Sequence, residues 1–412
     1  MTGDDISRRD AEAQSGRAGA PRTPGMTREV VSHKEHIDRK GWKRVRLGDV
    51  CLCLDNCRKP VSESERVCMK GSIPYCGANG IVDYVNDFTI NDAIILIAED
   101  GGYFDEYETR PIAYRINGKA WVNNHAHILK AKYGYCQDCI FYAIEHKNVV
   151  PFITSGTRAK LTKRELENIE LFIPATIEEQ RSIAISLATI DTHISTLQSL
   201  IAKYEAIKKA TVNLLLKPKA DWRIVPLGEI CEVCSSRRVH ESDWTDSGVP
   251  FYRARELVAL NEGRSITPLH ISENLYKELI ASSGAIRPGD LLVTGVGSIG
   301  VPYLVKGDDK FYFKDGNIIW FKNRGEIWPD YFLHAFRSDH IQKQIMEMAC
   351  VGTVGSYTIT NGKCTLIALP PLDEQKRIVA ILDSIDDTIS GLKSQLAKAQ
   401  DIKQGMMSYF FG

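Results

Sequence analysis

The sequence predicts an α+β fold in which two tandem α/β domains are joined by two long antiparallel coiled-coil helices with pseudo-two-fold symmetry. Three observations predict it. The chain has 412 residues, enough for two or three globular units. A direct repeat runs through it, and each copy ends in a long heptad pattern. We expect a disordered extension over 1–40, globular domains over 41–173 and 218–370, and helices over 174–217 and 371–412.

The direct repeat is visible in two pairs of segments. Trp42–Cys51, WKRVRLGDVC, recurs as Trp222–Cys231, WRIVPLGEIC. The segment 178–197 recurs as 373–392, each opening with an acidic residue followed by Glu-Gln. The two halves therefore share a fold, while the rest of their sequences differ.

The first part of each half has the pattern of a mixed globular domain. Short apolar runs such as Ala93–Ile97, Asp290–Thr294 and Asn317–Phe321 are separated by turns rich in Gly, Asn and Asp. Such runs predict short strands, and pieces such as Asp330–Phe336 have the period of an amphipathic helix. Each half is therefore predicted to begin with an α+β domain.

The last 40 or so residues of each half have a different pattern, with apolar residues at alternating steps of four and three. These residues are Ile183, Leu187, Ile190, Ile194, Leu197 and Ile201 in the first half, and Ile378, Leu382, Ile385, Ile389, Leu392 and Leu396 in the second. Each helix could pack on its own domain alone. A narrow apolar stripe on an otherwise polar helix instead favours pairing of the two helices with each other.

The ends of these helices are also marked. Thr176 with Glu179 is a capping box, Pro218 ends the first helix, and the second begins after Pro370 and Pro371. A helix of about 40 residues is about 60 Å long. Because the chain runs domain, helix, domain, helix, the second helix must return along the first. The two helices therefore pair antiparallel and separate the domains by a fixed distance.

Composition narrows the class of protein. No run approaches the roughly 18 apolar residues of a membrane-spanning helix, and the N-terminal segment lacks the apolar core of a secretory signal. Met26 is an alternative translation start, which would make residues 1–25 an upstream extension. We expect a cytoplasmic protein, in which the eleven cysteines are reduced. Lys+Arg and Asp+Glu number 52 each, so a nucleic-acid binder would need basic residues gathered on one face or charge from partner subunits.

Further short motifs complete the pattern: Ile73–Gly80 (IPYCGANG), Val249–Arg255 (VPFYRAR) and Gly289–Gly300 (GDLLVTGVGSIG), together with the Glu-Gln pairs at the two helix starts. No single motif is specific, but their order, duplicated in one chain, is. From about residue 42 to 412 the chain resembles the specificity (S) subunit of type I restriction–modification systems.

The resemblance implies a non-catalytic DNA sequence-recognition subunit without a cofactor. It implies that each domain reads one half of a bipartite, asymmetric site in double-stranded DNA. It also implies partners: two methyltransferase (M) subunits docked on the helices, and restriction endonuclease (R) subunits that join them. Phosphate contacts shared with the M subunits would explain the neutral charge.

Candidate DNA contacts are polar residues of types that read base edges or phosphates. They are Tyr75, Asn79, Asn123, Asn124, Arg158 and Lys160 in the first domain, and Arg237, Arg238, Arg253, Arg255, Ser298, Lys314 and Tyr357 in the second. For each one taken alone, a solvated surface or turn residue is the alternative.

The sequence leaves two other classes of protein open. Gly295–Gly300 fits G-x-G-x-x-G, the pattern of a cryptic S-adenosylmethionine-dependent methyltransferase, but Val301–Val305 reads as a strand where a helix is required. No phosphate-binding loop of the G-x-x-x-x-G-K-[ST] type occurs in the sequence. A scaffold that binds only proteins is the second alternative.

The spacing of the histidines and cysteines bears on whether the chain binds a metal. His125 and His127 share a strand face without a neighbouring carboxylate in sequence, so we expect structural or DNA-contact roles and no metal. The pairs Cys136/Cys139 and Cys231/Cys234 lack a second pair at zinc-site spacing and are expected to be structural thiols in a helix and a strand.

Overall fold

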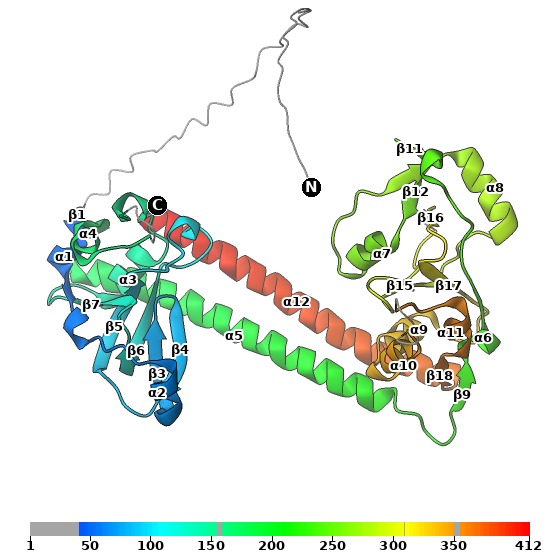
Figure 1. Ribbon diagram of the computed structural model, residues 1–412, viewed down its shortest axis with the longest axis horizontal. Helices are drawn as coiled ribbons and strands as arrows, with labels where there is room; N and C mark the ends of the chain where they lie inside the picture. The colour runs from blue at the N-terminus through cyan, green and yellow to red at the C-terminus, as the bar shows by residue number, and fades with distance from the viewer. Residues whose placement is uncertain (1–40, 155–158, 309, 350–354) are drawn as a thin grey trace, which may run out of the picture.

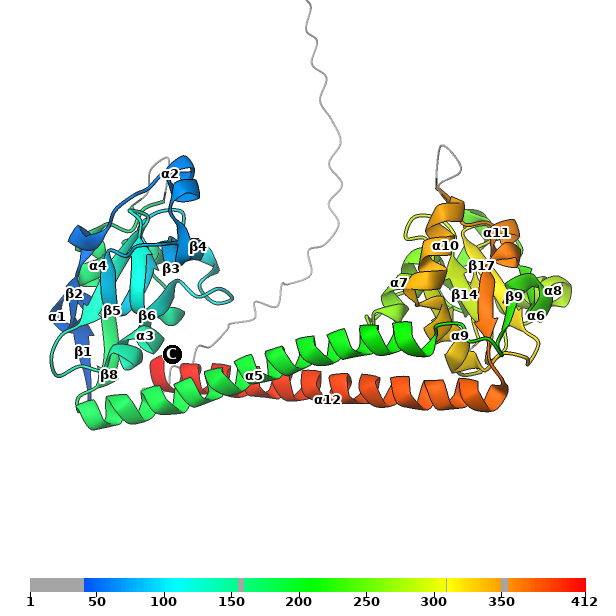
Figure 2. The ribbon, with the colours of Figure 1, turned by 90° about the horizontal axis from the view of Figure 1, so that it is seen from below.

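The computed structural model describes residues 41–154, 159–308, 310–349 and 355–412. The extension predicted over 1–40 lies outside these residues. Two globular domains lie at opposite ends of a pair of long helices (Figure 1). In Figure 2 both domains rise from the same side of that pair.

The first domain is built around a six-stranded sheet in which β3 and β6 pair in parallel and the other neighbours are antiparallel. The strand order is β2 (Cys51–Cys53), β7 (Ala126–Ala131), β5 (Ile90–Ala98), β6 (Ala113–Val122), β3 (Lys70–Gly77), β4 (Gly80–Val85). A separate antiparallel pair joins β1 (Trp42–Arg46) to β8 (Glu170–Pro174). The helices of this domain are α1 (Leu47–Val50), α2 (Glu63–Cys68), α3 (Gln137–Glu145) and α4 (Lys163–Asn168). Its short 3₁₀ turns are η1 (Asp55–Cys57), η2 (Phe104–Glu106) and η3 (Val150–Phe152).

The second domain splits its strands between two four-stranded sheets and one pair. The first sheet is β10 (Cys231–Cys234), β17 (Ile318–Asn323), β14 (Leu291–Thr294), β15 (Pro302–Leu304); the second is β11 (Trp244–Thr245), β13 (Leu269–Ile271), β12 (Val249–Tyr252), β16 (Tyr312–Phe313); the pair is β9 (Arg223–Pro226) with β18 (Leu366–Leu369). Its helices are α6 (Leu227–Ile230), α7 (Ala254–Asn261), α8 (Glu273–Ser283), α9 (Pro329–Phe336), α10 (Asp339–Ala349) and α11 (Ile359–Cys364), with the 3₁₀ turn η4 (Glu241–Asp243).

The sequence repeat is a repeat of topology. The β1–β8 pair of the first domain corresponds to β9–β18, and the run β2-β7-β5 corresponds to β10-β17-β14. Each domain also contains one parallel pair, β3–β6 or β12–β16. The second domain differs by adding α7, β13 and α8 around its parallel pair.

The helices α5 (Ile177–Leu215) and α12 (Leu372–Phe411) pack against each other and run in opposite directions, as predicted (Figure 2). The residues of the apolar stripe have two kinds of packing partner. Residues near the two-fold axis, such as Leu197 and Ile389, are buried along the helix pair. The early residues of each stripe enter domain cores instead: Ile183 and Leu187 that of the first domain, Ile378 and Leu382 that of the second. The remaining stripe residues, Ile190, Ile194, Ile385, Leu392 and Leu396, are half-buried, and Ile201 is buried.

Each helix also contacts the domain at its far end. Met406, Met407, Phe410 and Phe411 of α12 pack on the first-domain core, and Val212 and Leu215 of α5 pack on the second-domain core. Each globular domain is therefore attached to both helices. Packing on the domains and pairing of the helices, which the sequence presented as alternatives, occur together.

The Glu-Gln pairs anchor the helix starts. The amide of Gln180, fully buried, accepts from the backbone N–H of Cys136 at 2.8 Å and donates to the carbonyl of Pro174 at 2.9 Å. Gln375 repeats this arrangement with Trp328 at 2.7 Å and Pro370 at 2.8 Å. Both glutamines thus tie a spacer helix to the start of a domain helix, α3 or α9.

The predicted capping box at the start of α5 is only half formed. The backbone N–H of Glu179 donates to the Thr176 hydroxyl at 3.3 Å. The Glu179 carboxylate, however, accepts from the indole of Trp42 at 3.2 Å. Trp222 and Glu374 repeat this indole contact at 3.1 Å, so the tryptophan of each repeat reaches the glutamate of its own helix start.

Two reciprocal ion pairs mark the pseudo-two-fold axis of the helix pair. Lys208 of α5 lies 2.5 Å from Asp386 of α12, and Lys403 of α12 lies 2.9 Å from Asp191 of α5. In sequence, Lys403 and Asp386 each follow their counterpart by 195 residues, the offset of the second repeat. The symmetry is therefore present in charged contacts as well as in the chain path.

The glycine-rich segment Gly295–Gly300 connects antiparallel strands β14 and β15, so it opens no helix, as predicted. A Cβ on Gly295 would lie 2.5 Å from the carbonyl oxygen of Tyr357, which explains glycine there. Cys139 lies in α3, after Cys136 at its N-cap, and Cys231 and Cys234 lie in β10, also as predicted. Among the described helices, none combines the length and the apolar character needed to cross a membrane.

Candidate nucleic-acid interface

The parallel strands of the second domain end at a cluster of basic residues. Arg253 follows β12 and Lys314 follows β16, and the Lys314 N–H donates to the carbonyl of Tyr252 at 2.9 Å. Arg238 pairs with Asp315, next to Lys314, at 3.0 Å. Arg237 is exposed, and its backbone N–H donates to the hydroxyl of Tyr312 on β16. Strand topology therefore brings these four predicted residues to one edge.

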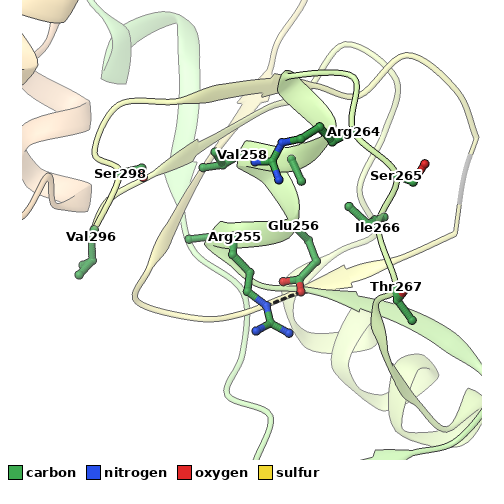
Figure 3. Close-up of a pocket in the computed structure, with 12 residues that line it drawn as sticks. Arg255, Glu256, Val258, Arg264, Ser265, Ile266, Thr267, Val296 and Ser298 are labelled. Carbon is green, nitrogen blue, oxygen red and sulfur yellow. Dashed lines mark hydrogen bonds and ion pairs between the residues drawn. The ribbon is translucent and has the colours of Figure 1, made fainter. Parts of the chain in front are cut away.

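Arg255 lies beside this edge, at the start of α7, and lines a groove of about 530 Å³. Figure 3 shows Val296 and Ser298 on one side of α7 and the segment Ser265–Thr267 on the other. Arg264 lines the same groove. A groove with two arginines and exposed hydroxyls offers donors to phosphates and to guanine edges.

Glu256 organises the two arginines at the start of α7. Its carboxylate, on a residue only 4% exposed, accepts from Arg253 Nη2 and from Arg255 Nε, each at 2.7 Å. Burial alone would raise the pKa of Glu256, but the hydrogen bonds from Arg253 and Arg255 lower it below the ordinary 4.5. Arg255 itself remains 71% exposed and can reach a ligand.

Two other predicted residues of the second domain have different positions. Ser298 is exposed in the turn after β14, where its carbonyl accepts from the Thr294 hydroxyl. Tyr357 is 1% exposed, and its hydroxyl lies 2.6 Å from that of Thr365. Because the Tyr357 side chain is inside the core, we withdraw it as a base contact.

The parallel strands of the first domain end at a cluster of asparagines. Asn123 and Asn124 follow β6, and Asn79 lies in the turn between β3 and β4. Asn79 donates to the carbonyl of Gly101 at 2.9 Å, and Asn123, which is buried, accepts from the backbone N–H of His125 at 2.8 Å. Asn124 is exposed. These asparagines thus occupy the same topological position, at the ends of the parallel strands, as Arg253 and Lys314 in the second domain.

Lys160 extends the first-domain edge, while Tyr75 does not belong to it. The Lys160 ammonium lies 2.7 Å from a Glu99 oxygen and is 48% exposed. Tyr75 is 2% exposed, and its hydroxyl lies 3.2 Å from the Val61 carbonyl, so it is also withdrawn. Arg158 lies outside the described residues.

His125 and His127 have carboxylate neighbours in the folded chain, although neither has one beside it in sequence. His125 Nδ1 lies 2.6 Å from Asp100, and His127 Nδ1 lies 2.6 Å from Asp55. The sequence could not reveal this, because Asp55 is 72 residues away from His127 in the chain. These partners come from η1 and from the residues after β5, which the fold brings beside β7.

Two groups of described side chains have the composition of metal ligands, with ligand atoms within 4.8 Å of one another. The first is Cys53, Asp55 and His127; the second is His334, Asp383 and Asp386. In the first group both nitrogens of His127 already have hydrogen-bond partners. In the second, Asp383 bonds to His334 and Asp386 pairs with Lys208. Contacts within the protein therefore account for both groups.

Sequence reasoning missed Arg264 and Glu256. Arg264 follows the end of α7 in Asn-Glu-Gly-Arg-Ser, a turn-like segment whose position beside Ser298 depends on the packing of α7. Glu256 was visible in sequence only as one of many acids. Its position one residue after Arg255 and three after Arg253 on a helix start was the available signal.

The fold and these two matched edges define a class: a two-headed recognition protein whose reading domains are held apart by a rigid helical spacer. Comparison with known proteins is consistent with that class. The family model for the type I restriction modification DNA specificity domain matches residues 39–206 and 219–400. The chain belongs to this family, and it is the non-catalytic DNA specificity subunit of a type I restriction–modification system, which binds DNA as part of that complex.

Two relatives and one solved structure resemble the chain over about nine-tenths of its length. A putative type I restriction enzyme specificity subunit of Haemophilus influenzae is 30% identical over 386 residues, 90% of this chain and 93% of the relative. The MjaVIII specificity subunit of Methanocaldococcus jannaschii is 24% identical, over 89% and 91%. The crystal structure of the type I S subunit from M. genitalium superposes with a TM-score of 0.61 at 15% identity, covering 90% and 96%, a likeness of fold.

Proposed function

We propose that the chain specifies a bipartite, asymmetric DNA site, with one half-site read by each domain. The observation that carries this proposal is the pair of edges at the ends of the parallel strands. They occupy the same topological position, but one bears Asn79, Asn124 and Lys160 and the other bears Arg253, Arg255 and Lys314. Asparagine side chains suit adenine and arginine side chains suit guanine, so the two half-sites should differ. We take residues 41–173 and 218–370 as the two reading units.

The helix pair is the element that sets the distance between the half-sites. Helices of 39 and 40 residues span about 60 Å at 1.5 Å per residue. Attachment of each domain to both helices supports a fixed separation. Residues 174–217 and 371–412 are thus proposed as the spacer.

The same helices are proposed to dock two M subunits. Ile207 and Leu214 of α5 are 39% and 71% exposed, and Ile402 and Tyr409 of α12 are 55% and 62% exposed. The second pair follows the first by 195 residues, so the two exposed stripes are related by the pseudo-two-fold axis. Two equivalent apolar stripes favour two copies of one partner. R subunits would then join in the cytoplasm, where the DNA lies.

The test is a map of methylated bases in the host genome, with the gene intact and deleted. We expect a two-part motif with adenine methylation to disappear on deletion and to return on complementation. Complementation with Arg255→Ala should relax one half of the motif only, because Arg255 belongs to one edge. A map unchanged by deletion, with the M subunit expressed, would contradict the proposal.

A further inference from the structure

Val82 is an exposed valine in the β3–β4 hairpin, beside the asparagine edge of the first domain. Cys76 pairs with Ile81 and Tyr75 pairs with Asp83, so Val82 is one extra residue on β4 and forms a bulge. Successive residues of a regular strand point to opposite faces, but Ile81 and Val82 are both exposed, by 46% and 61%. The bulge therefore re-aims the Val82 side chain, as bulges beside functional sites do.

The Val82 side chain lies over Gly77, at the end of β3, and close to Asn123. A Cβ on Gly77 would lie 2.7 Å from Cγ2 of Val82 and 3.4 Å from Nδ2 of Asn123. Glycine at this position therefore allows the valine methyl group and the asparagine amide to approach each other. The hairpin is also held in place, because the Tyr114 hydroxyl donates to the carbonyl of Gly77 at 2.6 Å.

Asn123 has a hydrogen-bond donor that the described part of the chain does not use. The residue is 8% exposed, and its Oδ1 accepts from the backbone N–H of His125 at 2.8 Å. This contact fixes the orientation of the amide, because a backbone N–H can only donate. Nδ2 has no acceptor within residues 41–154, 159–308, 310–349 and 355–412. Largely buried donors are normally paired, so an acceptor from a ligand fits this position.

A methyl group beside an N–H donor complements the major-groove edge of thymine. That edge presents the O4 acceptor next to the C5-methyl group. Cytosine presents the N4 donor in place of O4 and has no methyl group. A cytosine would therefore place its own donor against Nδ2 of Asn123 and leave Val82 without an apolar contact.

The equivalent place in the second domain has different chemistry. The Asn123 N–H donates to the carbonyl of Cys76 at 3.0 Å. The Lys314 N–H donates in the same way to the carbonyl of Tyr252, so Lys314 is the counterpart of Asn123. Arg253 follows Tyr252 and occupies the place of the glycine. Two cations thus stand where the first domain has a glycine and an amide.

We propose that Val82 and Asn123 together read one thymine of the first half-site. Asn123 Nδ2 donates to O4 of this base, and Val82 packs on its C5-methyl group. This inference rests on the proposed function, in which the two domains read separate half-sites. It adds Val82 as a specificity-determining residue and restricts this kind of readout to one half-site.

The experiment measures binding of the complex of this chain with its M subunits to duplexes in which each thymine of the site is replaced in turn by deoxyuridine. Deoxyuridine lacks only the C5-methyl group. At one thymine the replacement should weaken binding about fourfold, the contribution of about one buried methyl group. In the Val82→Ala complex the penalty at that thymine should fall below about 1.5-fold, because the methyl group has lost its partner. If no thymine shows a penalty that depends on Val82, the inference is overturned.

Val67→Ala is the matched control for Val82→Ala. Val67 is 63% exposed and lies on α2, which precedes the start of β3, whereas Gly77 is at its end. The fourfold penalty of wild type should therefore persist in this variant. Loss of the penalty in both variants would contradict a direct contact between Val82 and the base.

Asn123→Asp tests the hydrogen bond at the same base pair. The carboxylate keeps an acceptor for the His125 N–H but lacks the Nδ2 donor, and aspartate suits the N4 donor of cytosine. Wild type should prefer thymine over cytosine there by about tenfold, and the variant should lose or reverse this preference. Equal weakening on every duplex would contradict the assignment to Asn123. Val82→Ala decides the inference by itself if Asn123→Asp does not fold.

Failure of the proposed function has a different signature. If replacement of either complete half-site leaves binding unchanged, the division of reading between the domains fails first. Strong discrimination at both half-sites, without a thymine whose penalty depends on Val82, contradicts only the present inference.

Discussion

Glu256 has two effects on the edge of the second domain that we propose contacts DNA. It holds Arg253 and Arg255 in a defined geometry, and its charge offsets part of theirs. Because its pKa is lowered, the paired state is stabilised above the ordinary value of 4.5 and is lost only as pH falls through the lower folded value. At neutral pH the proposed DNA contacts Arg253 and Arg255 are therefore ordered before DNA arrives, and we expect this to limit the entropy lost on binding.

Replacing this carboxylate should raise the affinity for non-specific DNA and lower the discrimination between sites. In Glu256→Gln the arginines lose their counter-charge, so we expect non-specific DNA to bind several-fold more tightly. The salt dependence should steepen by about one phosphate contact, and discrimination between sites should fall. The measurement is binding to specific and random duplexes over a salt series. Glu273→Gln, which removes the partner of Lys310 on α8, is the matched control and should change neither property.

Gln375 provides a prediction about stability. Gln375→Leu leaves the buried Pro370 carbonyl and the part-buried Trp328 N–H without partners, at a cost of roughly 2 to 3 kcal/mol. Urea denaturation followed by circular dichroism should show the loss. Gln395→Leu, an exposed site on the same helix, should lose less than about 0.5 kcal/mol. Similar losses in the two variants would argue against the anchoring role of Gln375.

Single residues were the least predictable part of the site. Residue type and turn context correctly placed Asn124, Lys160 and Arg255 at an exposed surface. The same reasoning failed for Tyr75 and Tyr357, because a tyrosine can satisfy its hydroxyl inside the core. Whether it does so depends on distant partners such as Val61, which local sequence does not reveal.

At the scale of elements, heptad spacing was sufficient to predict two long paired helices, and the order of domains and helices along the chain predicted their antiparallel direction. It was not sufficient to show that the stripe changes partners along its length. Ile183 and Leu197 occupy the same kind of position in the pattern, yet one enters a domain core and the other the helix pair. Periodicity identifies the face that is buried, and only the packed structure identifies what buries it.

Helix pairing refines the prediction for spacer length. A heptad inserted in α5 alone would displace Lys208 from Asp386 and Lys403 from Asp191, so the two-part motif should be lost. Matched heptads between Leu197 and Ile201 and between Leu392 and Leu396 keep the pairs together. They lengthen the spacer by about 10 Å, or about three base pairs. Methylation mapping should show that increase, and an unchanged spacing would refute the role of the helices in setting it.

At the scale of the whole molecule, the pseudo-two-fold axis relates surfaces as well as folds. The exposed pairs Ile207/Leu214 and Ile402/Tyr409 are chemically similar, whereas the reading edges at the ends of the parallel strands are not. Under the proposed function, two identical M subunits docked on a symmetric spacer would act at two different half-sites.

The number of docked M subunits should follow these stripes. Leu214→Asp or Tyr409→Asp alone should weaken one of the two sites at least tenfold, and the double variant should weaken both. Native mass spectrometry would report two, one and no bound M subunits in turn. Ile185→Asp, at an exposed position outside these pairs whose counterpart in the second repeat is the small Ala380, should leave two bound. Loss of both subunits from either single variant would contradict independent equivalent sites.

The attachment of each domain to both helices also has a rotational consequence. The first domain is held by Leu187 of α5 and Phe411 of α12, and the second by Leu382 of α12 and Val212 of α5, so neither domain can turn about the spacer axis. A DNA duplex, in contrast, turns by about 35° with each base pair. A site with one extra base pair between its halves therefore presents the second half at the wrong angle as well as the wrong distance. We therefore expect the proposed spacer to select the torsional phase of the DNA as well as the distance between the half-sites.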